Sequence, residues 1–142
     1  MKLCHCEWRR KTRPRQKLLI GCPSTLTSKK ISNPCHASHL QHDLAKRQMS
    51  GFGNLLAFEV SGGEAAAFAV LNNLQLIDIF NNLGDGKSLA CHPSTPTLSN
   101  LSLADRESLG IFGGHIRLLV GLEDADNLIE DLDNTLAFLG AR

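Results

Sequence analysis

The sequence has little of what most catalytic and binding signatures require. It contains no tyrosine and one tryptophan, so it offers few aromatic rings on which nucleic-acid bases could stack. It has no apolar run long enough to span a bilayer. It also has no glycine-rich phosphate loop, no Cys-x-x-Cys pair and no recognisable nucleophile beside its base. These absences argue against a membrane protein, a nucleic-acid-binding protein and a self-contained catalytic centre.

What is present is the composition of a globular domain. A chain of 142 residues, 42% of them hydrophobic and 20% charged, is large enough to bury one core. Its net charge of +1 hides an uneven distribution, because nine of the 15 Lys and Arg residues lie in residues 1–30, where Glu7 is the sole acid. The remaining residues carry six basic and thirteen acidic side chains. The two parts therefore differ in kind.

Residues 1–36 form a basic leader rich in cysteine and histidine. They show neither helical nor strand periodicity, so we expect an irregular segment that does not fold with the rest. The composition resembles a transit peptide but lacks a clear amphipathic face. Zinc is not supported, because the Cys-x-Cys of Cys4 and Cys6 is not followed by a matched pair. Five cysteines, an odd number, without a secretory signal predict reduced thiols and a cytoplasmic location.

Residues 37–142 read as a succession of short helices and strands. In the first long helix, Ser61 and Glu64 have capping-box spacing, and in the last, Glu123 and Asp124 lie where a helix N-terminus favours negative charge. The pattern predicts an α/β domain with three or four short strands and helices on one side. Apolar periodicity and turn formers predict helices over 42–49, 61–74, 102–109 and from about 123 onward, and strands over 54–60, 75–79, 87–91 and 113–124.

The most informative single residue is an arginine inside the last apolar strand. Alternation sends Ile116 and Leu118 to one face and Arg117 to the other. Its guanidinium is always charged and planar, which suits bidentate capture of a carboxylate or phosphate, although a surface ion pair is the simpler interpretation. The loop 80–86 is rich in turn formers, and its Asn82 could help to hold a carboxylate or could serve only the turn. The residues themselves predict an anion-binding half-site.

Three segments in order resemble one enzyme family. The resemblance is to the C-terminal domain of the Cys/Met-metabolism enzymes that use pyridoxal phosphate, among them cystathionine gamma-synthase, cystathionine gamma-lyase, methionine gamma-lyase and the homoserine-ester sulfhydrylases. The Asn-Asn-Leu-Gly-Asp form of the loop looks most like that of O-succinylhomoserine sulfhydrylase. The segments are QHDLAKRQMSGFG at 41–53, NNLGDGKSLACHP at 81–93 and IRLLVGLED at 116–124.

This resemblance implies a fold, a cofactor and a substrate site. The fold would be the small C-terminal domain of fold-type I pyridoxal-phosphate enzymes, a short, mostly antiparallel sheet with helices on one side. The arginine that matches Arg117 binds the α-carboxylate of the amino-acid substrate, and the position that matches Asn82 lies beside it. Family members replace or eliminate groups at the γ-carbon in methionine and cysteine metabolism, with the cofactor as electron sink. They are homotetramers.

The resemblance also implies that half of the active site lies elsewhere. The Schiff-base lysine and the cofactor-binding residues belong to the family's large domain, and Lys46 and Lys87 match other family positions. We therefore assign no catalytic, cofactor-binding or metal-binding residue and expect a fragment that is inactive alone. Within the match, Asn54 replaces a usual glycine and Leu98 replaces a common histidine.

Two alternatives to an inactive enzyme fragment remain open. The chain could be a non-catalytic module that associates with a full-length homologue. The leader, residues 1–36, could instead bind nucleic acid or zinc, although it offers only Trp8 for stacking. We expect this leader to be an out-of-frame or foreign segment, because the family likeness ends before about residue 37.

Overall fold

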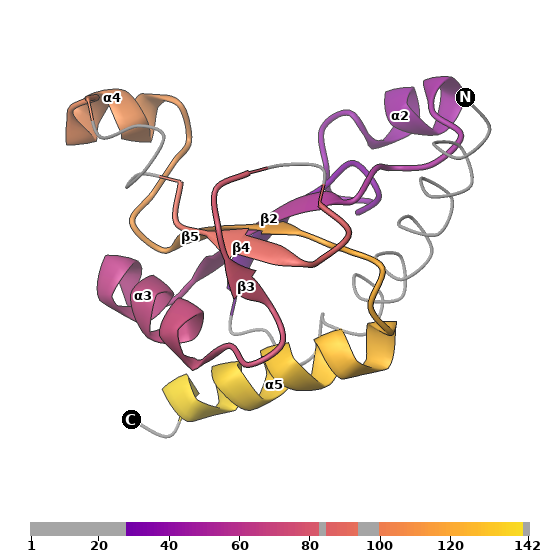
Figure 1. Cartoon of the computed structure of the whole chain (residues 1–142). Helices are drawn as coiled ribbons and strands as arrows, with labels where there is room; N and C mark the ends of the chain where they lie inside the picture. The colour runs from indigo at the N-terminus through magenta and orange to yellow at the C-terminus, as the bar shows by residue number, and fades with distance from the viewer. Residues whose placement is uncertain (1–27, 83–84, 94–99, 141–142) are drawn as a thin grey trace.

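A five-stranded sheet runs through the part of the chain that the computed structural model describes, residues 28–82, 85–93 and 100–140 (Figure 1). The order of its strands is β1-β2-β5-β4-β3. Neighbouring strands are antiparallel except β3 and β4, which are parallel. The predicted α/β class is confirmed, with five strands rather than three or four. The strands are β1 (Ser28–Ser32), β2 (Leu55–Val60), β3 (Asp78–Ile79), β4 (Leu89–Cys91) and β5 (His115–Leu119).

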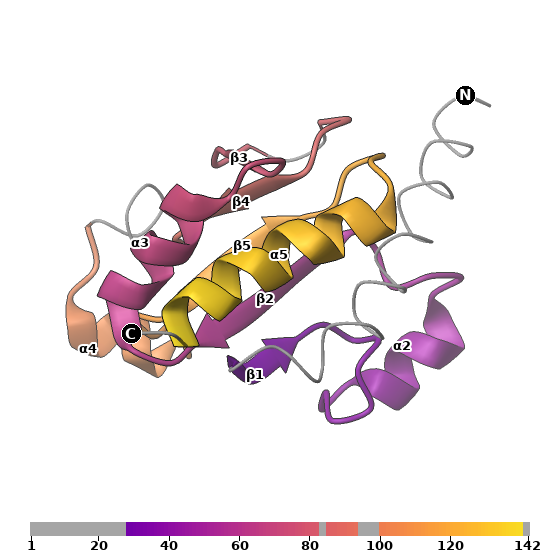
Figure 2. The ribbon, with the colours of Figure 1, turned by 90° about the horizontal axis from the view of Figure 1, so that it is seen from below.

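Two helices cover one face of the sheet, and two lie at opposite sides of the molecule. Helices α3 (Gly63–Asn73) and α5 (Ala125–Gly140) pack side by side, and Figure 2 shows α5 lying along β2 and β5. The short helices α2 (His42–Gln48) and α4 (Leu103–Ser108) are far from each other in both views. None of the described helices is long and apolar enough to cross a membrane.

Alternating side chains of β2 and β5 form the floor of the core. Phe58 pairs with Ile116 and Leu56 pairs with Leu118, so these four side chains point to the same face and are buried there. Complete burial of a side chain of this size contributes about 1.5–3 kcal/mol. The predicted orientation of Ile116 and Leu118 toward one face of β5 is confirmed. The helices cover this floor with Ala67, Val70 and Leu71 of α3 and Leu128, Leu132 and Leu136 of α5.

Helix α3 begins differently from the sequence prediction. Its N-cap is Gly62, which has no side chain and adopts a left-handed conformation with φ of 102°. A β-carbon there would lie 2.9 Å from the Cβ of Ala66, so only glycine makes this turn without strain. The predicted N-cap is therefore wrong by one residue, because Gly62 rather than Ser61 is the residue that starts the helix.

The N-terminal edge of the sheet lies inside the segment that we expected to be irregular. Residues 28–32 form β1, whose Ile31 pairs with Phe58 of β2. Ile31 also packs against the core cluster. The irregular leader of residues 1–36 is therefore wrong for 28–32, where backbone pairing with β2 orders a segment that has one apolar residue. Residues 1–27, with Cys4, Cys6 and Trp8, lie outside the described residues.

The opposite edge strand is shorter than predicted. We expected a strand over 75–79, but β3 covers only Asp78–Ile79. The backbone N–H groups of Gln75, Leu76 and Ile77 donate to the carboxylate of Asp131 on α5, at 2.9, 3.0 and 3.2 Å. These backbone N–H groups bond to Asp131 and are therefore not available for strand pairing with β4.

Candidate anion-binding site

Arg117 lies in the middle of β5, between two neighbouring strands. It is in register with Ala57 of β2 and Cys91 of β4. Its side chain projects from the face opposite the core, because the next residue, Leu118, is buried beneath the helices with 1% exposure. The Arg117 side chain is half-buried. The strand therefore holds a guanidinium at a fixed place on the face away from α3 and α5.

The loop after β3 meets this guanidinium. Nη2 of Arg117 donates a hydrogen bond to the carbonyl oxygen of Asn81 at 2.7 Å. A guanidinium carries five N–H donors, so one carbonyl does not saturate it. Asn82, the next residue, is exposed. An anion site at Arg117 requires the loop to lie close to the strand, and it does. The loop atom that contacts Arg117 is the carbonyl oxygen of Asn81, not the side-chain amide of Asn82.

The two ends of this loop are fixed to the sheet. At the entry, the N–H of Phe80 donates to the carbonyl of Ala90 at 3.0 Å. At the exit, the N–H and hydroxyl of Ser88 both donate to the carboxylate of Glu123, each at 2.7 Å. We expected Glu123 to serve the N-terminus of the last helix, whereas the structure directs its carboxylate to Ser88. That pairing joins residues 35 positions apart, which the sequence pattern does not show.

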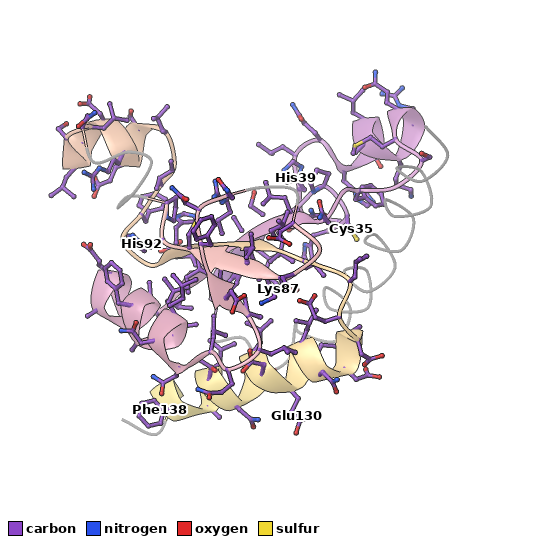
Figure 3. The ribbon with its side chains drawn as sticks, viewed as in Figure 1. Cys35, His39, Lys87, His92, Glu130 and Phe138 are labelled. Carbon is purple, nitrogen blue, oxygen red and sulfur yellow. The ribbon has the colours of Figure 1, made fainter. Side chains whose placement is uncertain are left out.

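Neither lysine whose environment the structure describes, Lys46 or Lys87, fits the anchoring of pyridoxal phosphate. The ammonium of Lys87, a residue labelled in Figure 3, lies 3.0 Å from Asp78 Oδ2. The hydrogen bond and the charge of Asp78 raise the pKa of Lys87 above its ordinary value. A lysine that forms a Schiff base needs a neutral amine, which a lowered pKa favours. Lys46 lies exposed in the last turn of α2.

No metal centre forms among the described residues. His, Cys, Asp and Glu side chains do not gather there in any group of three that could hold an ion. Cys35 is a free thiol, and His42 contacts the carbonyl of Pro34 through Nδ1 at 2.8 Å. His36 at the end of the leader likewise makes a local contact, because its Nδ1 accepts the N–H of Ser38.

Of the two residues that depart from the family pattern, Asn54 lies in the described part of the chain and Leu98 does not. Asn54 joins the ends of the two central strands: its Nδ2 donates to the carbonyl of Val120 at 3.1 Å, and its own carbonyl accepts from the N–H of Val120 at 2.8 Å. The amide side chain therefore adds a bond that glycine could not make. Leu98 lies outside the described residues.

An apolar groove of about 340 Å³ lies beside the loop. Asn81, whose carbonyl binds Arg117, lines it together with Ile79 and Phe80, which are each 53% exposed. The rest of its wall is Phe68, Leu71, Asn72, Cys91 and His92. His92 is fixed there by Gly113, whose carbonyl lies 2.7 Å from Nε2. The groove places exposed hydrocarbon next to a cationic site.

Known proteins resemble this chain over most of its length. The O-succinylhomoserine sulfhydrylase of Mycobacterium tuberculosis is 44% identical over 125 residues, which are 85% of this chain and 30% of that protein. The O-succinylhomoserine sulfhydrylase of Pseudomonas aeruginosa is 45% identical over 102 residues, 72% of this chain and 25% of that protein. The family model described as Cys/Met metabolism PLP-dependent enzyme matches residues 25–137, so the match includes β1.

Solved structures agree with these relatives. Cystathionine gamma synthase of Xanthomonas oryzae pv. oryzae, in complex with aminoacrylate and cysteine, has a TM-score of 0.86 at 31% identity and aligns with 96% of this chain and 35% of its own. A putative O-acetylhomoserine (thiol)-lyase of Campylobacter jejuni, which carries a pyridoxyl-lysine phosphate, has a TM-score of 0.87 at 31% identity and aligns with 94% of this chain and 32% of its own. The chain spans about a third of these relatives' length. It belongs to the family of pyridoxal-phosphate-dependent enzymes of cysteine and methionine metabolism.

Proposed function

We propose that this chain supplies the substrate-carboxylate side of a trans-sulfuration active site. Arg117 binds the α-carboxylate of an amino acid, and Asn82 lies beside it. The reaction is γ-replacement on an O-acyl homoserine, the chemistry of the sulfhydrylases and gamma-synthases of methionine and cysteine biosynthesis. The observation that supports this most is the placement of Arg117 on the face away from the core, in contact with the loop at Asn81.

Arg117 acts by binding and orienting. Its planar fork of N–H donors pairs with both oxygens of a carboxylate. The strand fixes the base of the side chain, and the carbonyl of Asn81 fixes one end of the fork before a ligand arrives. A preoriented receptor holds the substrate in one geometry, which is the contribution of proximity to catalysis.

The residues that anchor the cofactor lie, in this proposal, on polypeptide outside this chain, so the chain alone is inactive. After incubation with pyridoxal phosphate and removal of the excess by dialysis, the purified chain should retain no stoichiometric Schiff-base absorption band. The full-length M. tuberculosis sulfhydrylase serves as the positive control. Stoichiometric retention of the cofactor on one specific lysine of this chain, fixed by borohydride after dialysis and detected by mass spectrometry, would contradict the proposal.

A chimera tests the role of Arg117 directly. Residues 25–142 would replace the matching C-terminal segment of the M. tuberculosis relative, and Arg117→Lys would be compared with the unchanged chimera. Loss of a bidentate, charged contact costs about 1.5–3 kcal/mol, so KM for the amino acid should rise about 10- to 100-fold. Arg106→Lys on α4 makes the same chemical change away from the loop and should leave KM unchanged. Equal KM values for both variants would refute the carboxylate role.

A second candidate is a non-catalytic module that associates with a full-length homologue. Apolar side chains on two separate surfaces favour it, because contiguous exposed hydrocarbon marks interaction sites. Ile79 at the end of β3 and Phe80 directly after it are exposed, and Leu103 and Leu109 are 73% and 63% exposed on or beside α4. Coexpression with the M. tuberculosis relative and size-exclusion chromatography would test this. A chain that elutes only as a monomer argues against the module.

We place the chain in the cytoplasm as part of the same proposal. Cys35 and Cys91 are free thiols, which agrees with a reducing compartment. Alkylation of intact cells before lysis should find both thiols reduced, and protection of Cys35 as a mixed disulfide would argue for another location.

A further inference from the structure

A buried hydrogen-bonded cluster joins the loop beside Arg117 to the end of β5. Ser88 is completely buried, and its N–H and hydroxyl donate to the two carboxylate oxygens of Glu123 at 2.7 Å each. The same hydroxyl accepts the N–H of Gly121 at 2.8 Å. The serine hydroxyl is thus satisfied as both donor and acceptor, and hydrogen bonds to a carboxylate are the strong ones.

Backbone contact in this cluster is closer than a side chain at Gly121 would permit. A β-carbon on Gly121 would collide with the Glu123 carboxylate and with the backbone of Gly86 and Lys87. The N–H of Leu122 donates to the carbonyl of Gly86 at 2.8 Å across the same gap. The exit of the loop and the segment after β5 therefore lie directly against each other.

Three hydrogen bonds connect this cluster to Arg117. The carbonyl of Ser88 accepts the N–H of Asp78 at 3.1 Å, which sets the register of β3 against β4. Directly after β3, the N–H of Phe80 donates to the carbonyl of Ala90 at 3.0 Å. Asn81 follows, and its carbonyl lies 2.7 Å from Nη2 of Arg117. Displacement of Ser88 would move β3 and with it the atom that orients the guanidinium.

A role confined to the last helix does not account for these contacts. Helix α5 begins at Ala125, and the carboxylate near its start that accepts a backbone N–H of the first turn is Asp124, which binds Asp126 at 2.9 Å. The carboxylate of Glu123 is turned to Ser88, toward the loop. The helix has its own acid, and Glu123 serves a different segment.

We infer that Glu123 is a positioning residue for the substrate-carboxylate site and acts on Arg117 through Ser88, β3 and Asn81. The inference rests on the proposed role of Arg117, and it names the group that holds the receptor in its binding orientation. Glu123 does not touch the ligand in this scheme. Ser88 and Glu123 act as one unit, because loss of Glu123 leaves the buried Ser88 hydroxyl without its acceptor and loss of the Ser88 hydroxyl leaves the half-buried Glu123 carboxylate without one of its donors.

The first test uses the full 142-residue chain without any ligand. NMR of the arginine side chains measures how fast the Arg117 guanidinium rotates, which its bond to Asn81 slows. We expect the rotation to be at least tenfold faster in Ser88→Ala and in Glu123→Ala. If Glu123→Ala fails to fold, the isosteric Glu123→Gln replaces it, with the same expected increase. The matched control is Asn33→Ala, which removes a buried side chain that binds the carbonyl of Leu55 and the N–H of Cys35.

The control separates positioning from general loss of stability. Asn33→Ala should lower the free energy of unfolding and leave the Arg117 rotation as in the wild type. Unchanged rotation in both Ser88→Ala and Glu123→Gln would overturn the inference, as would equal acceleration in Asn33→Ala.

The second test adds acetate as a simple carboxylate probe. Acetate should shift the Arg117 side-chain signals of the wild type, and its affinity should fall at least threefold in Ser88→Ala. If acetate leaves the wild-type Arg117 signals unmoved, the proposed carboxylate site fails, while the ligand-free rotation rates still decide whether Glu123 positions Arg117. Binding of acetate with equal affinity by wild type and Ser88→Ala would count against the positioning role alone.

Discussion

Individual buried polar residues in this domain fix the connections between its elements. Asp131 on α5 is buried, and it accepts the three N–H groups of residues 75–77. Asparagine at this position has one acceptor oxygen, so Asp131→Asn should lower the free energy of unfolding by about 2–3 kcal/mol. Urea unfolding measures this loss. Glu130→Gln, an exposed change one residue away, should stay within about 0.5 kcal/mol, and equal losses would refute the assignment.

Two glycines separate steric from conformational requirements. Gly121→Ala forces a β-carbon against the Glu123 carboxylate and the loop backbone, and overpacking of this kind costs about 1–3 kcal/mol. Gly110 has φ of 74° and open space around its missing β-carbon, so Gly110→Ala should cost only the left-handed strain, about 1 kcal/mol. In thermal unfolding, Gly121→Ala should have a lower midpoint temperature than Gly110→Ala. The opposite order would contradict the close contact at Gly121.

The ion pair of Lys87 and Asp78 should make the free energy of unfolding depend on pH, and the raised pKa of Lys87 gives the sign of this dependence. The pKa of Lys87 is raised above the ordinary value of 10.5 by its hydrogen bond to Asp78. Its contribution to stability is therefore complete below that value and is lost as the pH rises through the higher folded-state pKa. Because both side chains are well exposed, the effect is small and screened by salt.

The measurement compares urea midpoints of the wild type and Lys87→Gln. The small difference seen at about pH 8 should shrink as the pH rises above 10.5 and through the higher folded-state pKa of Lys87. Lys46→Gln, which removes an exposed lysine on α2, provides the reference for a general change of net charge. A difference between wild type and Lys87→Gln that grows above pH 11 would show that the pair does not act as assigned.

At the scale of elements, α4 is a helix held mainly by its own caps. None of its six residues, all within the described range 100–140, is buried. Ser102 Oγ accepts the N–H of Asp105 at 3.2 Å and donates to its carboxylate at 2.6 Å. Ser102→Ala should remove about 1 kcal/mol from the local stability of α4. Amide hydrogen exchange of Arg106 and Leu109 should accelerate about fivefold, while the midpoint of global unfolding should stay unchanged; a shift of that midpoint would show that α4 belongs to the core.

The elements that the sequence predicted well are those with a buried face. Alternation identified β2 and β5, and helical periodicity identified α3 and α5, because each presents apolar side chains at its own repeat. The edge strands were predicted less well, because β1 was missed and β3 was expected to be longer than it is. β1 has Ile31 as its one apolar residue and forms by backbone pairing, and β3 lost its first residues to Asp131, a partner more than 50 positions away.

The anion-binding site was also predicted only in part from the sequence. Arg117 could be singled out because a charge interrupts an apolar strand, and the turn formers of the loop indicated where its partner would lie. The partner atom itself could not be predicted. It is the backbone carbonyl of Asn81, and because every residue has such a carbonyl, the amino-acid type at position 81 does not indicate the contact. Ser88 and Glu123 were also hidden, since a serine and a glutamate 35 residues apart form no local pattern.

At the scale of the whole molecule, the sheet order makes an N-terminal segment part of the core. β1 covers the outer edge of β2, and its Ile31 packs against the core cluster. Deletion through residue 32 should therefore lower the free energy of unfolding by about 2 kcal/mol relative to deletion through residue 27, the order expected for the loss of one apolar side chain. The exposed β2 edge should also promote aggregation. Equal stability and solubility of the two truncated chains would contradict a structural role for β1.

The bond from Arg117 to the carbonyl of Asn81 has a consequence for how this protein tolerates mutation. A carbonyl is common to all amino acids, so residue 81 can change its side chain without losing the contact, provided that the backbone path is kept. The path depends instead on Ser88, Gly121 and Glu123, none of which reaches the guanidinium. A saturation mutagenesis map should show a permissive position in direct contact with the arginine and three restrictive positions at a distance from it.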